Sequence, residues 1–108
     1  MNKRKTIASP TEIEVVERVF TDAGYDNTIQ REDLLSRSGL GHRVLRAAIA
    51  ELVKQGQPII ANRRGGYLLT DDCTLLSTEI RRLNKQIAQI RLRVSGLRQY
   101  YALARATH

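Results

Sequence analysis

Basic side chains gather at two points of this 108-residue chain. His42, Arg43 and Arg46 stand at the start of a segment with helical periodicity, and Arg63 and Arg64 separate two apolar runs in the stretch IIANRRGGYLL. An arginine can bind a guanine edge through two hydrogen bonds or hold a phosphate group. Both clusters therefore indicate contact with a polyanion, and the alternatives are a solvated helix face and a solubilising turn.

The charge of the whole chain favours the same kind of partner. The formal net charge is +7, and a strongly basic protein attracts nucleic acid. Residues 1–72 hold 11 Lys and Arg against 10 Asp and Glu, whereas residues 73–108 hold seven Lys and Arg against Glu79 alone. Most of the excess positive charge is therefore expected in the C-terminal segment.

Enzyme chemistry is not expected from the residues present. The chain has no Cys and His cluster at metal-ligand spacing. The stretch Gly39-Leu40-Gly41 lacks the third glycine of a nucleotide-binding loop. We therefore expect a protein that is not an enzyme and that needs neither a metal nor a cofactor.

The single cysteine and the hydropathy pattern indicate the compartment. Cys73 has no partner within the chain for a disulfide, which is typical of a reducing environment. No apolar run is long enough to span a membrane, and the basic N-terminus lacks the apolar region of a signal peptide. The predicted location is the cytoplasm, without a membrane partner.

Cap and turn signals divide the first 72 residues into short elements. Ser9-Pro10-Thr11-Glu12 has the pattern of a capping box, which predicts a helix over 10–23 that ends at Gly24. The remaining pattern predicts a very short strand at Ile29, helices over 31–38 and 42–55, and strands over 58–61 and 67–69. The glycines between these strands are expected to supply positive φ. This order of elements predicts a winged helix-turn-helix fold, mainly α with a small β-hairpin.

The stretch REDLLSRSGLGHRVLRAAIAELVKQGQPIIANRRGGYLL resembles the compact winged-helix domain at the N-terminus of the biotin-ligase repressor and of related sugar-metabolism repressors. The similarity covers residues 10–70 and consists of a turn, an N-terminally basic helix and a short hairpin ending in GY-L. Small phage-encoded DNA-binding proteins, in which a winged domain precedes a basic helix, are similar too. The chain departs from the family at Gly41, where the family often has a Ser or Thr N-cap.

The resemblance implies a role for each face of the third helix. Its apolar stripe, Leu45, Ile49, Leu52 and Val53, would supply the core. The opposite face would lie in a DNA major groove and carries His42, Arg43, Arg46, Ala47 and Ala50. The alanines would permit close approach or contact with a thymine methyl group. Arg63 and Arg64 would reach phosphate or the minor groove from the tip of the wing.

A heptad repeat occupies the segment from about Thr74 to Thr107. Its apolar stripe comprises Leu76, Ile80, Leu83, Ile87, Ile90, Val94, Leu97 and Tyr101. This pattern predicts a coiled coil through which the protein oligomerises, and branched residues at a with mainly Leu at d favour a parallel dimer. A parallel pair would, however, bring Arg93 near Arg98 of the partner. An antiparallel pair, a higher oligomer and packing of the stripe on the winged domain therefore remain alternatives.

The sequence thus predicts three parts: a flexible basic arm over 1–8, a winged helix-turn-helix domain over 9–72, and a long basic heptad helix over 73–108. We expect a homo-oligomer, preferably a dimer, that binds double-stranded DNA. Its role would be that of a transcriptional regulator or of a phage-type accessory in replication or packaging. The alternatives are a protein-interaction or scaffold module, and RNA binding by the basic helix.

Overall fold

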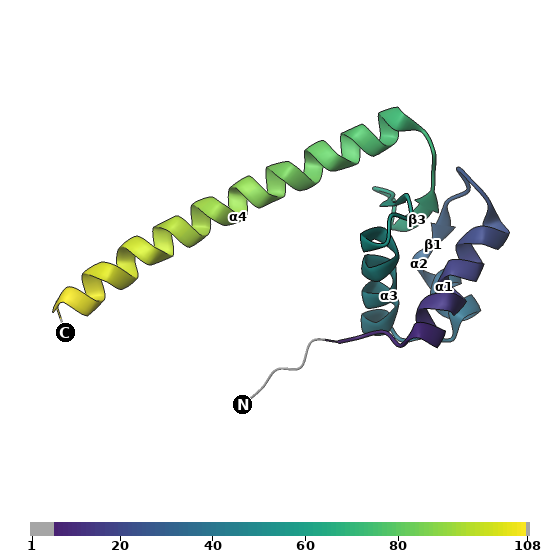
Figure 1. Ribbon diagram of the computed structural model, residues 1–108, viewed down its shortest axis with the longest axis horizontal. Helices are drawn as coiled ribbons and strands as arrows, with labels where there is room; N and C mark the ends of the chain where they lie inside the picture. Colours follow the sequence, from purple (N-terminus) through teal and green to yellow (C-terminus); the bar gives the residue numbers. More distant parts are fainter. Residues whose placement is uncertain (1–5, 108) are drawn as a thin grey trace. The chain divides into compact units, whose positions relative to one another are not determined.

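Four helices and a small three-stranded sheet form residues 6–107, the part that the computed structural model describes (Figure 1). The elements are α1 (Pro10–Ala23), β1 (Ile29–Gln30), α2 (Arg31–Ser38), α3 (His42–Lys54), β2 (Ile59–Ala61), β3 (Gly66–Leu69) and α4 (Cys73–Thr107). The fold is therefore mainly α with a small β-hairpin and a long C-terminal helix, as predicted. Two compact units meet in sequence between Asp72 and Cys73.

α1 begins where the capping-box pattern predicts. The Ser9 hydroxyl accepts a hydrogen bond from the Glu12 amide at 3.2 Å, and the Glu12 carboxylate accepts one from the Ser9 amide at 2.8 Å. These two bonds satisfy amides that have no partner inside the helix. The helix ends at Gly24, whose φ of 80° lies in the region that favours glycine.

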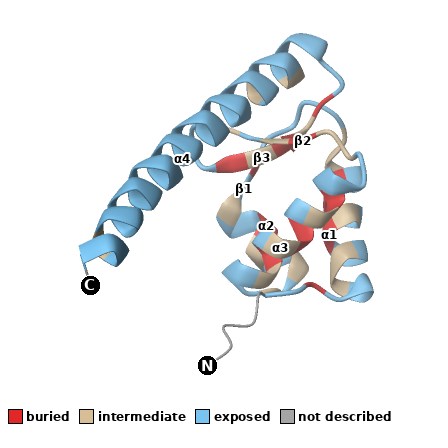
Figure 2. Ribbon diagram, turned by 60° about the vertical axis from the view of Figure 1, so that its left-hand side comes forward, coloured by how far each residue is buried: buried red, intermediate tan, exposed pale blue. Residues whose placement is uncertain are grey.

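One hydrophobic core joins α1, α2, α3 and the sheet. Its largest fully buried apolar side chains are Val16, Phe20, Leu34, Leu45 and Leu52. Figure 2 shows buried positions in red on these three helices and on the sheet. Burial of an apolar side chain of this size contributes about 1.5–3 kcal/mol, so this core holds the unit together.

The core differs from the predicted stripe of α3 at one position. Leu45, Ile49 and Leu52 are buried as expected, but Val53 is 43% exposed. Each residue turns the helix by about 100°, so Val53 lies about 100° from Leu52 and about 140° from Ala48, at the edge of the buried face. Ala48 is completely buried instead, because its small side chain fits where α3 packs closely on its neighbours.

The sheet has the strand order β1-β3-β2, with both neighbouring pairs antiparallel. The hairpin of β2 and β3 is therefore extended by β1, and Ile29 of β1 pairs with Tyr67 of β3. Of the two glycines at the turn, only Gly65 has positive φ, at 94°. Gly66 is needed for a different reason: an added Cβ would lie 2.7 Å from the Ile29 carbonyl oxygen and would push β1 off β3.

The start of the folded unit also differs from the predicted arm. Residues 1–5 of that arm lie outside the described part of the chain. Ala8, its last residue, is buried in the core at 8% exposure, and Ser9 already caps α1. Ala8 therefore packs as part of the domain, because it lies directly before the first helical turn.

α4 is a continuous helix of 35 residues with none buried, which at 1.5 Å per residue makes it about 52 Å long. The larger side chains of its heptad stripe are well exposed, from 41% for Val94 to 71% for Leu97. Charged residues recur throughout the helix, and neither α4 nor any other helix within residues 6–107 has the apolar length that a membrane crossing requires.

Candidate nucleic-acid interface

α3 follows α2 after a turn that glycine makes possible. Gly39 ends α2 in the left-handed conformation, with φ of 70°, and the Ser38 hydroxyl accepts a hydrogen bond from the Leu40 amide at 3.3 Å. Gly41 is the N-cap of α3 and provides no side-chain hydrogen bond. The first turn of α3 holds no acidic residue, so the positive end of its dipole is not neutralised by its own side chains.

The first two turns of α3 present three basic side chains. His42, Arg43 and Arg46 are all exposed, while Leu45 between them is buried at 2% exposure. Leu45 therefore anchors the turn and fixes the direction in which the arginines project. A helix held by one face with basic side chains on the other can bring those side chains to a flat or grooved polyanion.

The two alanines of the predicted contact face lie farther along α3. Ala47 is half-buried and packs against the core. With Ala50 it lines a hollow that Thr6 and Ile7 also line. Ala47 lies one helical turn after Arg43 and directly after Arg46. Its side chain is partly covered, whereas those of His42, Arg43 and Arg46 are exposed.

The hairpin places Arg63 and Arg64 at its outermost point. The Gly65 amide donates to the Asn62 carbonyl oxygen at 3.1 Å, and the Asn62 amide donates to the Gly66 carbonyl oxygen at 2.7 Å. This is a β-turn with the two arginines at its central positions, followed by a left-handed glycine. Both arginine side chains are exposed.

Asn62 holds this tip in shape, which the sequence pattern alone does not assign. Its side-chain oxygen accepts a hydrogen bond from the Arg64 amide at 3.0 Å, and its side-chain nitrogen donates to the Thr28 hydroxyl at 3.1 Å. Asn is a preferred residue at the first position of a β-turn, so the role of Asn62 in the turn could have been predicted from the sequence. Its hydrogen bond to Thr28 depends on tertiary structure and could not have been predicted.

Charge is strongly divided within residues 6–72. Residues 42–69, which contain α3 and the hairpin, hold five Lys and Arg against Glu51 alone, a net charge of +4. Residues 6–41, which contain α1 and α2, hold three Arg against seven Asp and Glu, a net charge of −4. The net charge of this part of the chain is therefore small only in total. Its positive charge lies in the half that contains both arginine clusters.

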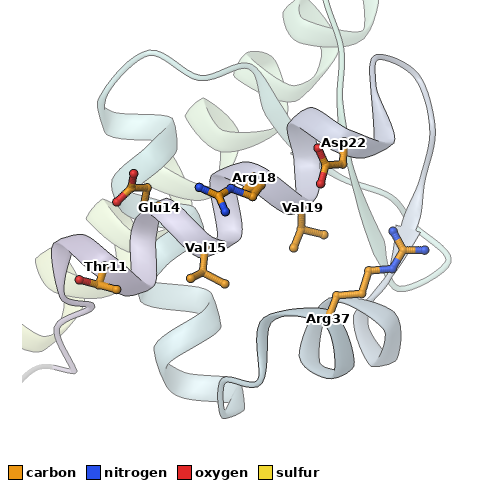
Figure 3. Close-up of a pocket in the computed structure, with 7 residues that line it drawn as sticks. All are labelled: Thr11, Glu14, Val15, Arg18, Val19, Asp22 and Arg37. Carbon is orange, nitrogen blue, oxygen red and sulfur yellow. The ribbon is translucent and has the colours of Figure 1, made fainter.

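A shallow hollow on α1 and α2 has a different character. Figure 3 shows that Glu14, Val15, Arg18, Asp22 and Arg37 line it, together with Thr11 and Val19. Its charges are mixed, with two carboxylates and two guanidinium groups, so it favours neither a polyanion nor a cation. Within residues 6–107, no three Asp, Glu, His or Cys side chains stand close enough to hold a metal ion.

The two arginine clusters belong to one folded unit but are not linked directly. No hydrogen bond or ion pair joins His42, Arg43 or Arg46 to the hairpin tip within the described residues. Their common support is the core, since β2 follows α3 in sequence and Ile59 is buried in the same cluster as Leu45.

Comparison with models of known protein families, with curated proteins and with solved structures finds no match for this chain.

Proposed function

We propose that this protein binds double-stranded DNA as an oligomer, with α3 in the major groove and the β2–β3 hairpin as a wing on the backbone or minor groove. Arg43 and Arg46 would contact base edges or phosphates from α3, with His42 beside them. Arg63 and Arg64 would contact phosphates from the hairpin. The protein would act in the cytoplasm as a transcriptional regulator or as a phage-type accessory in replication or packaging.

The observation that carries the proposal is the division of charge in residues 6–72. Five of the eight basic residues there lie in α3 and the hairpin, with one acid among them. The hairpin needs neither arginine for its own geometry, because Asn62 and Gly65 form the turn through backbone and amide hydrogen bonds. Side chains that the fold does not use, in the region of highest positive charge, are available for a ligand.

The order of elements supports the same proposal. A helix, a three-residue turn and a second helix precede an antiparallel hairpin, and winged helix-turn-helix proteins use such an arrangement to place the second of these helices in a major groove. Exposed basic residues at the amino end of α3 suit this placement, since the N-terminal residues of a recognition helix contact the bases.

The proposal is tested by DNA binding at several salt concentrations, measured by fluorescence anisotropy on mixed-sequence duplexes. If Arg43, Arg46, Arg63 and Arg64 each neutralise one phosphate, every copy bound to the duplex should contribute about −3 to −4 to the slope of the logarithm of the binding constant against the logarithm of salt concentration. Arg64→Ala should reduce the contribution of each bound copy by about one. Absence of binding at low salt would overturn the proposal.

RNA binding by α4 is the second candidate, because α4 carries an excess of basic residues along its exposed length. The same titration separates the two functions. Preference for single-stranded or duplex RNA over duplex DNA, unchanged by Arg43→Ala and Arg64→Ala, would favour α4 as the binding element.

A further inference from the structure

The heptad stripe of α4 is an unpartnered apolar face. Within the chain none of its residues is buried, and its large side chains from Ile80 to Tyr101 are 41–71% exposed. The stripe runs from Leu76 to Tyr101 and is about 38 Å long. An apolar face of this length with heptad spacing can pair with a matching face on a second helix. α4 of a second copy of this chain presents the identical stripe along its whole length.

We propose that α4 pairs with α4 of a second copy in antiparallel orientation. In this pairing each layer of the seam combines an a position with a d position. The layers are Leu76 with Tyr101, Ile80 with Leu97, Leu83 with Val94, and Ile87 with Ile90, each formed twice. All eight stripe residues of both copies are covered, and no stripe residue is left beyond the overlap.

The charges that flank the stripe favour this orientation. In a parallel pair, g positions face e positions one heptad later in the partner. Arg93 would then face Arg98 of the other copy twice, and Glu79, the only acid of α4, would face Asn84. The parallel pair therefore contains two like-charge contacts and no opposite-charge contact.

In the antiparallel pair, g positions flank g positions and e positions flank e positions. Arg93 then lies between Glu79 and Gln86 of the other copy, while Arg98 lies between Ser77 and Asn84. Both repulsive contacts of the parallel pair are replaced by an acid, amides and a hydroxyl. The one like-charge approach that remains is between Arg91 of one copy and Arg91 of the other, across the two-fold axis.

Residue size points the same way. A parallel pair sets Tyr101 against Tyr101 in one layer, whereas the antiparallel pair sets it against Leu76. Layers that combine large and smaller side chains interdigitate better than layers of two large ones. The stripe contains no Asn or Lys at an a position that would fix a parallel register.

The orientation has a consequence for DNA that rests on the proposed function. Each copy's residues 6–72 are joined to the amino end of its own α4. In the antiparallel pair, Cys73 of one copy lies opposite Ala104 of the other, so the two amino ends are about 47 Å apart. Two DNA-binding units joined to amino ends this far apart could hold two DNA segments, whereas a parallel pair would bring the two amino ends together and so favour one shared site.

Cys73 is the only cysteine and is exposed, so it reports the orientation directly, without DNA. The full-length protein and the variant Ala104→Cys are treated with an oxidant or a short bismaleimide and separated by non-reducing electrophoresis. The antiparallel pair predicts no covalent dimer for the natural sequence and efficient dimer formation for Ala104→Cys. The double variant Cys73→Ser/Ala104→Cys is the control and should not cross-link.

Cross-linking of the natural protein through Cys73, together with cross-linking of the control variant, would overturn the proposal in favour of a parallel pair. Light scattering on the untreated protein should give twice the chain mass of 12.2 kDa, and a single-chain or larger mass would also overturn it. Failure of DNA binding leaves these results unaffected, so the pairing and the proposed function are tested separately.

Discussion

At the scale of single residues, several side chains have structural roles that explain the shape of the candidate interface. Thr70 is completely buried and donates a hydrogen bond to the Asp26 carboxylate at 2.6 Å. Asp26 has a φ of 63°, a conformation that Asp and Asn adopt more readily than most residues. These contacts fix the loop before β1 to the end of β3 and so support the strands that carry the hairpin tip.

Two glycine substitutions should have opposite effects on stability. Gly66→Ala should lower the free energy of unfolding of residues 6–72 by about 1–3 kcal/mol, because the new Cβ would meet the Ile29 carbonyl oxygen at 2.7 Å and the Thr28 methyl group at 2.8 Å. The matched change Gly96→Ala should stabilise α4 by up to about 1 kcal/mol, since nothing lies near that position and Ala is the better helix former.

Urea denaturation and thermal melting followed by circular dichroism would measure both changes. Gly66→Ala without any loss of stability would show that β1 does not approach β3 as closely as described. A loss of helicity in Gly96→Ala would show that this glycine serves a close contact of α4.

At the scale of elements, the sequence predicts more of the fold than of the site. The bounds of α1 follow from Ser9, Pro10 and Gly24, and α2 ends at Gly39 as expected, because caps are local and do not depend on distant residues. The exposure of Val53 and the closeness of Gly66 to β1 were not predictable. Both depend on how α3 and the strands pack against other elements, which periodicity does not specify.

The candidate site was likewise predictable from the sequence only in part. Arg43, Arg46, Arg63 and Arg64 are all exposed, as the pattern of charge and apolar residues suggests. The half-buried position of Ala47 was not predictable, because it depends on α3 packing in the core beside the segment Thr6–Ala8. Whether the exposed arginines bind DNA stays a prediction that solution experiments must test.

α4 contains one local ion pair whose titration can be followed. The Glu79 carboxylate accepts hydrogen bonds from Arg82 Nε at 2.7 Å and Nη2 at 2.9 Å. These bonds, with the attraction between the charges, hold the pKa of Glu79 below the ordinary glutamate value of 4.5 against the opposing effect of partial burial. Because the pKa is lowered in the folded helix, the stabilisation is present above about pH 4.5 and is lost as the pH falls through the lowered pKa.

An NMR titration of the Glu79 carboxyl carbon in the full chain should therefore give a pKa below 4.5. Arg82→Gln should bring the pKa back toward that value, whereas Lys85→Gln, which removes a charge outside this pair, should change it less. An unchanged pKa in Arg82→Gln would contradict the described pair.

At the scale of the whole molecule, positive charge is concentrated in two segments of the chain. Residues 42–69 carry a net charge of +4, and residues 73–108 carry a further +6. In the proposed account the first group recognises DNA and the second flanks the seam of an antiparallel pair. The basic side chains of α4 that point away from that seam would add attraction to DNA that weakens with salt.

The central claim, that α3 recognises DNA through its basic face, is tested most directly by two variants with equal loss of charge. Arg43→Ala/Arg46→Ala removes the exposed arginines of α3, and Arg18→Ala/Arg37→Ala removes two exposed arginines from α1 and α2. Affinity for duplex DNA is measured by fluorescence anisotropy at one fixed salt concentration. The account predicts a loss of at least about tenfold for the first variant and a change within about twofold for the second. Equal losses in the two variants, or no loss in the first, would contradict it.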